Sequence, residues 1–180
     1  QRAKESCGGS VGEGPMTYIL FSVDRRSRMK PPLPGRYFGN CVGPAIGMAP
    51  KSELAAAGVG GLFTACAAVA SAIDEAVRDV EKLSRMDACS SDRIKEAKAS
   101  ADGLLTVAGS PRFRVYELDF GFGRPLKVDI LSVARTGAVA VAESRIFIGG
   151  MEIGVSLQPA GMDRYRKCFT DAIAWLHQQN

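Results

Sequence analysis

The feature that most constrains the fold is a succession of short strand-like runs, separated by glycine and proline breakers, with helix-like segments between them. Runs rich in β-branched or aromatic residues, or alternating in polarity, predict strands. They occur at Met16–Val23, Tyr37–Pro50, Leu104–Ala108, Leu126–Ala134, Ala138–Ala142 and Met151–Leu157. Helical spacing or helix-start residues predict helices over Gly60–Leu83, Ser90–Asp102 and Gly161–His177. This order favours an α/β fold in which helices flank a mixed β-sheet.

The composition fits a folded domain preceded by a tail. A chain of 180 residues, 46% apolar and 23% charged, can bury a sizeable core, as one domain or as half of a two-domain protein. The opening stretch QRAKESCGGSVGEGP is small, polar and glycine-rich, which is typical of a flexible loop or tail over residues 1–15. The domain is therefore expected over residues 16–180. Because residue 1 is Gln, we expect the chain to begin partway through a longer protein.

Several classes of partner are disfavoured by the residues present. The net charge of +4 is spread along the chain, without the cluster of basic and aromatic residues that nucleic-acid binding would need. No run approaches the ~18 apolar residues of a membrane span, and no signal peptide is visible. We therefore expect a cytoplasmic protein that contacts neither nucleic acid nor membrane. The five cysteines form no CxxC pair and are odd in number, which indicates free thiols and no metal site.

Residue chemistry alone identifies no convincing general base or nucleophile. GGSVG at Gly8–Gly12 matches the G-x-S-x-G elbow but lacks the strand before it and the helix after it, so a tail is the better interpretation. GVGG at Gly58–Gly61 could offer N–H groups to a phosphate, but a plain loop leading into a helix is favoured. His177, the single histidine, is expected on the surface at the end of the last helix.

Three motifs in order along the chain resemble one protein family. They are PPLPGR followed by YFGNC at Tyr37–Cys41, SPRFRVYELDFGFGRP at Ser110–Pro125, and AVAVAESR followed by GGMEIGVSL. Together they resemble the BAHD family of plant acyl-CoA-dependent acyltransferases, in the branch that malonylates anthocyanins, flavonoids and other phenolic glycosides. The resemblance implies the chloramphenicol-acetyltransferase-like α/β fold.

The resemblance implies structural roles for the DFGFGRP block. Its aspartate, Asp119, is expected to pair with Arg26 or Arg28 of the upstream D-x-R-x-R segment, as a guanidinium fork suits a carboxylate. Phe122 stands where the family has tryptophan and is expected to keep a large apolar plug without the indole N–H. The structural motif is thus Arg26, Arg28, Asp119, Phe120, Gly121, Phe122 and Gly123.

The resemblance also implies which residues face substrate. Gly39 and Asn40 are expected near the CoA thioester, where the Asn40 amide could help hold the developing oxyanion. Ser110 and Arg112 are weaker candidates for contacting the acceptor or the acyl carboxylate, since Arg112 could equally be a solvated loop cation.

The catalytic histidine and aspartate of the family's HxxxD motif have no counterpart in this chain. The chain therefore looks like the C-terminal half of the enzyme, with the N-terminal half as its partner, malonyl-CoA as co-substrate, no bound cofactor and a phenolic glycoside as acceptor. Alone, it is expected to be inactive, because base catalysis would be missing. The alternative is a non-catalytic, truncated or decoy domain that binds a ligand or partner without turnover.

Overall fold

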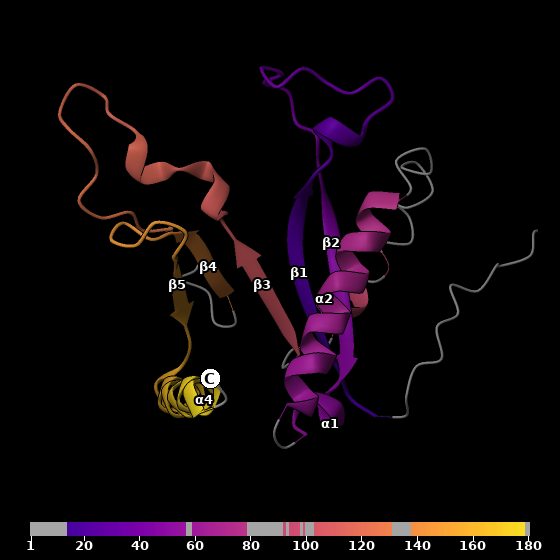
Figure 1. Cartoon of the computed structure of the whole chain (residues 1–180). Helices are drawn as coiled ribbons and strands as arrows, with labels where there is room; N and C mark the ends of the chain where they lie inside the picture. The colour runs from indigo at the N-terminus through magenta and orange to yellow at the C-terminus, as the bar shows by residue number, and fades with distance from the viewer. Residues whose placement is uncertain are drawn as a thin grey trace, which may run out of the picture. The chain divides into compact units, whose positions relative to one another are not determined.

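The structure is a computed structural model that describes residues 14–56, 59–78, 92, 94–97, 99, 103–130 and 138–178. The chain divides into two compact units, Gln1–Leu104 and Leu105–Asn180. Figure 1 shows the elements of both units in chain order.

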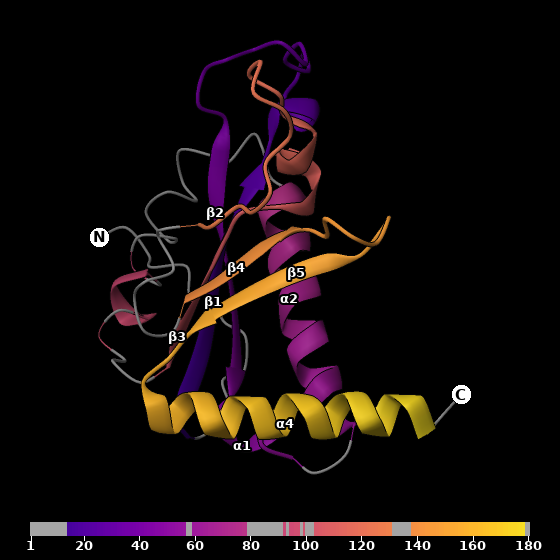
Figure 2. The ribbon, with the colours of Figure 1, turned by 90° about the vertical axis from the view of Figure 1, so that its left-hand side faces the viewer.

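The first unit is an antiparallel strand pair covered by one long helix. Strand β1 (Met16–Asp24) pairs with β2 (Val42–Pro50) so that Met16 lies opposite Pro50 and Asp24 opposite Val42. The short helices η1 (Arg26–Arg28) and α1 (Lys51–Leu54) follow β1 and β2, and α2 (Gly60–Arg78) runs along the strands, as Figures 1 and 2 show. The strand predicted over Met16–Val23 and the long helix are confirmed where they are described. The strand predicted over Tyr37–Pro50 begins only at Val42, because residues 37–41 form an irregular loop.

Small residues let α2 lie close to β2. The buried core of this unit consists of Ala45, Ala72 and Ala76, with Phe21 and Val23 of β1 packed against it. At Gly47, a Cβ atom would come within 2.9 Å of the Ala68 carbonyl oxygen in α2. The absence of a side chain at Gly47 therefore allows the backbones of β2 and α2 to approach closely.

Helix α2 also corrects one expectation from the sequence. Its window Gly60–Val77 has a mean hydropathy of 1.3 and is long and apolar enough to cross a membrane, judged by length and composition alone. The expectation that no segment approaches such a span was therefore wrong. The finding is weak support for a membrane segment, because a helix that packs in a protein core can have the same apolar composition. In α2, Ala72 and Ala76 pack against Ala45 of β2 in this way.

The second unit contains a small mixed sheet and a terminal helix. Strand β3 (Leu104–Ala108) runs parallel to β4 (Ala138–Glu143), and β4 pairs antiparallel with β5 (Met151–Ser156). The short helices η3 (Pro111–Phe113) and η4 (Val115–Glu117) follow β3, and α4 (Pro159–Gln178) ends the unit. Three predicted strands and the terminal helix are thus confirmed, with small differences at their ends.

The strand predicted over Leu126–Ala134 is wrong in its described part, because residues 126–130 are irregular. Side chains take the backbone groups that a strand would pair: Arg145 Nη1 donates to the Leu126 carbonyl at 2.9 Å, and Val128 N–H donates to the Tyr116 hydroxyl at 3.3 Å. Of the helix predicted over Ser90–Asp102, the described residues 92, 94–97 and 99 are helical. The GGSVG stretch, most of the predicted tail and the end of the predicted long helix lie outside the described residues.

Candidate functional site

Arg26 holds the loop that carries Gly39 and Asn40. Its guanidinium donates to the Gly39 carbonyl through Nη2 at 3.0 Å and to the Tyr37 carbonyl through Nε at 3.3 Å. Asp24 accepts both the Arg26 N–H and its Nη1 through Oδ1, each at 3.0 Å. These contacts, the backbone N–H first, keep the pKa of the Asp24 carboxyl below its usual range. The first arginine of D-x-R-x-R thus fixes the shape of the YFGN loop.

Asn40 lies exposed in the loop just before β2, and its side-chain oxygen accepts a hydrogen bond. Its Oδ1 accepts the Val42 N–H at 3.3 Å, an Asx-type turn. Because the oxygen is the acceptor in this bond, the side-chain NH₂ group is the part that can donate to a ligand. A Cβ atom at Gly39 would collide with the Tyr37 ring, so a side chain there would require this exposed ring to move. This loop can therefore offer an amide donor from a fixed backbone.

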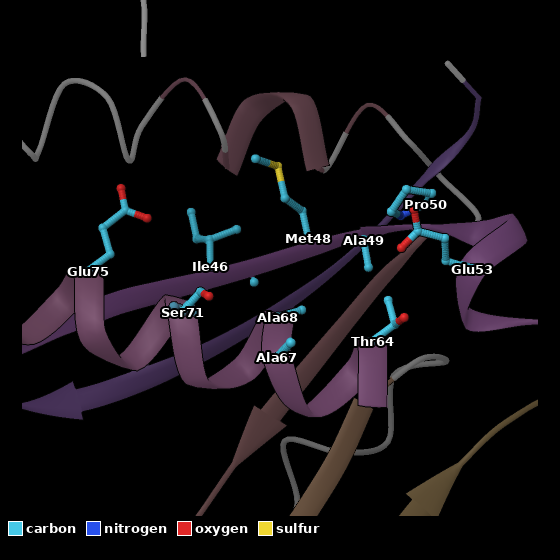
Figure 3. A pocket seen from close by; sticks show the side chains of 12 residues that line it. Ile46, Met48, Ala49, Pro50, Glu53, Thr64, Ala67, Ala68, Ser71 and Glu75 are labelled. Carbon is cyan, nitrogen blue, oxygen red and sulfur yellow. The ribbon is translucent and has the colours of Figure 1, made fainter. Parts of the chain in front are cut away.

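A groove of about 380 Å³ lies between β2 and α2. Figure 3 shows small residues, among them Ala67 and Ala68, between the two elements, with Glu53 and Glu75 toward opposite ends. Thr64 and Ser71 add hydroxyls from α2. Sequence analysis missed this groove. The small residues on both elements could have indicated it, because small side chains on facing elements leave space between them.

Ser110 and Arg112 lie in the second unit, at the turn after β3. The Ser110 hydroxyl accepts the Arg112 N–H at 3.2 Å and so caps η3. Arg112 is exposed, and Arg114, in the left-handed region at φ 50°, pairs with Glu117. Ser110 therefore has a clear local structural role, and Arg112 is a surface cation.

The DFGFGRP block is a loop shaped by its own aspartate. Asp119 Oδ1 accepts the N–H groups of Gly121 at 2.8 Å and Gly123 at 3.0 Å. Both glycines have positive φ, 95° and 89°, which explains why glycine is used there. Phe120 and Phe122 are 79% and 96% exposed. Phe122 is therefore not an apolar plug within this unit, because the turn directs its ring outward.

A network that sequence analysis missed connects β4, β5 and η4. The Tyr116 hydroxyl donates to Glu152 Oε2 at 3.0 Å, and the Tyr116 N–H donates to Glu143 Oε1 at 3.0 Å. Burial, followed by the Glu152 carboxylate, raises the pKa of the Tyr116 phenol. Glu152 Oε1 accepts the Arg145 N–H at 3.1 Å. The network anchors the block without forming a reaction centre.

The predicted site residues are thus distributed over the two units. Gly39 and Asn40 are held together with Arg26 in the first unit, whereas Ser110, Arg112 and the DFGFGRP block belong to the second. Arg28 is exposed in η1. The ion pair of Asp119 with Arg26 or Arg28 stays a prediction. Within the described residues, no group of three His, Cys, Asp or Glu side chains could hold a metal ion.

Comparisons with known proteins show which protein family this chain is similar to. A family model described as the Transferase family matches residues 3–171. Phenolic glucoside malonyltransferase 1 of Arabidopsis thaliana is 41% identical over 79% of the chain and 29% of that protein. An anthocyanin 5-O-glucoside-6'''-O-malonyltransferase of Salvia splendens is 29% identical over 92% of the chain and 35% of that protein.

A solved structure supports the fold. Vinorine synthase matches with a TM-score of 0.57 at 20% identity, over 84% of this chain and 34% of that one. The chain spans about a third of the length of these relatives. It therefore belongs to the Transferase family, the BAHD acyltransferases, and has their chloramphenicol-acetyltransferase-like fold.

Proposed function

We propose that this chain is the C-terminal part of an acyl-CoA-dependent O-acyltransferase that transfers malonyl from malonyl-CoA to a hydroxyl of a phenolic glycoside. The observation that carries the proposal is the family match over residues 3–171, together with malonyltransferases among the relatives. The chain lacks HxxxD, so the base would come from an N-terminal segment of the same protein.

In the proposed reaction, a histidine of the N-terminal segment takes the proton of the acceptor hydroxyl, and the oxygen attacks the thioester carbonyl. The tetrahedral oxyanion collapses, the carbon–sulfur bond breaks, and CoA leaves as a thiolate that takes up a proton. The contribution of this chain is to position groups and to stabilise charge. Asn40 is the best-placed candidate, since its NH₂ group can donate while its oxygen holds the loop.

The reassembled enzyme tests the proposal. Malonyl-CoA and a phenolic glucoside are incubated with this chain alone, or with this chain plus a segment that carries HxxxD from a relative, and malonylated product is measured by mass spectrometry. We expect no product from the chain alone and turnover from the pair. Turnover by the chain alone would overturn the division of roles. Binding of malonyl-CoA without turnover in the pair would favour the non-catalytic alternative.

Two substitutions at Asn40 separate its loop contact from its donor. Asn40→Asp keeps an oxygen for the Val42 N–H but removes the NH₂ group, whereas Asn40→Ala removes both. If the amide donates to the oxyanion, both variants should lower kcat by about 10²–10³-fold. If Asn40 only shapes the loop, Asn40→Asp should keep most of the activity.

A further inference from the structure

Arg25, which follows β1, has a buried charged side chain whose Nε lacks a hydrogen-bond partner within the described residues. It is 5% exposed, and its backbone N–H donates to the Cys41 carbonyl at 3.0 Å. Residues buried to this degree are rarely charged unless they are paired. Sequence analysis assigned no role to this position.

The Arg25 guanidinium lies in a space in the first unit that exists because residue 43 is glycine. Phe21 and Val23 of β1 pack on the alanine core of this unit. Arg25 follows the end of β1, where its backbone has φ −106° and ψ −1°. On β2, buried Gly43 leaves room for it, since a Cβ atom at Gly43 would collide with the Arg25 guanidinium. The guanidinium therefore occupies the space that a side chain at position 43 would take.

The polar atoms of this guanidinium are incompletely satisfied. Its Nε is buried and lacks a hydrogen-bond acceptor. Among the described residues, the neighbouring Asp24 carboxylate bonds Arg26 instead. A buried guanidinium is costly to the extent that its charge and its donors are uncompensated, and within the described residues the Nε is such a donor. The arrangement therefore calls for an anion that can accept hydrogen bonds from a planar fork.

We propose that Arg25 binds a carboxylate, and that in the enzyme this is the free carboxylate of a malonyl-type acyl donor. The proposal rests on the function proposed above and adds the residue that selects the donor. The Arg25–Cys41 hydrogen bond joins the Arg25 segment to the residue that follows Asn40. A malonyl group carries its carboxylate one methylene from the thioester carbonyl, so its two binding groups must come from neighbouring segments such as these.

The test measures binding to this chain and needs no turnover. NMR signals of the arginine Nε–H groups are followed while malonate, acetate, malonyl-CoA or acetyl-CoA is added at constant ionic strength. The Arg25 signal is assigned as the one missing in Arg25→Met. We expect it to shift saturably with malonate and malonyl-CoA, with malonyl-CoA bound about tenfold or more tightly than acetyl-CoA, as expected for one charge-assisted pair.

Variants identify the source of the carboxylate. Arg25→Met should abolish the preference for malonyl-CoA over acetyl-CoA, Arg25→Lys should keep part of it, and Arg28→Met, which changes an exposed arginine nearby, should leave it intact. An Arg25 signal unaffected by malonate and by malonyl-CoA would overturn the proposal. A shift with malonate, but equal affinities for the two CoA esters, would overturn its donor part and indicate a carboxylate side chain from elsewhere in the protein.

These outcomes are independent of the proposed function. If the reassembled enzyme with Arg25→Met transfers malonyl with an unchanged preference over acetyl, the proposed function stands and the role of Arg25 fails. If the unsubstituted assembly shows no transfer while Arg25 binds malonate, the proposed function fails and the site remains.

Discussion

Replacing Asp119 tests whether the DFGFGRP block is held in shape by the side chain of its own aspartate. Asp119→Ala removes the acceptor for two N–H groups, those of Gly121 and Gly123, at 2.8 and 3.0 Å. A net hydrogen bond contributes about 0.5–1.5 kcal/mol, more when one partner is charged. Asp119 is exposed, so water can solvate the released N–H groups, and the lower half of that range applies to each. We therefore expect a loss of about 1–2 kcal/mol.

Asp119→Asn is the matched control. The amide oxygen can still accept one or both N–H groups, so the loss should be at most half of that of Asp119→Ala. Urea-induced unfolding, followed by circular dichroism, gives the free energy of unfolding of each variant. The local-turn reasoning is refuted if Asp119→Ala leaves stability unchanged, or if Asp119→Asn costs as much as Asp119→Ala.

The same melts examine the predicted ion pair with Arg26 or Arg28. Removing one partner of a buried ion pair lowers the free energy of unfolding by about 3–5 kcal/mol, clearly more than the loss of the turn contacts alone. If such a pair exists, replacing Asp119 and its arginine together should cost less than the sum of the single changes. If Asp119→Ala costs only about 1–2 kcal/mol and the losses of the two single substitutions add up in the double variant, Asp119 stabilises the turn and makes no ion pair.

Three further outcomes are expected. Gly43→Ala should destabilise the chain by about 1–3 kcal/mol, because its Cβ collides with the guanidinium beneath it, whereas Gly35→Ala, with open space around it, should be nearly neutral in the same melts. The lowered pKa of Asp24 means that its contribution to stability is complete above the unfolded-state pKa and is lost as pH falls through the folded value; acid titration should show this below about pH 4, and Asp24→Asn should remove it. The raised pKa of Tyr116 stabilises the fold below the unfolded-state pKa of about 10, and this contribution is lost as pH rises beyond it; Tyr116→Phe should flatten the alkaline limb of the stability profile, and an unchanged limb would contradict the reasoning.

The sequence predicted the elements whose signal is local. The β-rich runs that became β1, β3, β4 and β5 and the two long helices show clear periodicity or clear breakers, so neighbouring residues decide their structure. The strand predicted over Leu126–Ala134 looked equally convincing. It failed in its described part because two distant groups, the Arg145 guanidinium and the Tyr116 hydroxyl, take its backbone hydrogen bonds. No pattern within the run shows that competition.

The candidate site was predictable only in part, for the same reason. The motifs directed attention to Asn40 and to DFGFGRP, and the loop geometry gives both a physical role. The groove between β2 and α2 and the burial of Arg25 depend on which faces meet, so they follow from the packing of β1, β2 and α2 together. A sequence motif shows which segment a residue belongs to, but whether its side chain is buried depends on how distant segments pack together.

The arginines after β1 show how those two kinds of information combine. By motif, Arg26 and Arg28 are the residues of interest, and Arg25 between Asp24 and Arg26 carries no signal. In the structure, Arg26 is engaged by Asp24 and by two loop carbonyls, and Arg28 is exposed, while Arg25 is buried with an unsatisfied Nε. A charge that already has local partners gains little from a further one, whereas a buried charge with an unsatisfied donor gains more from a carboxylate that reaches it. Arg25 is therefore the position in this segment where a substitution should change ligand preference more than it changes the shape of the loop.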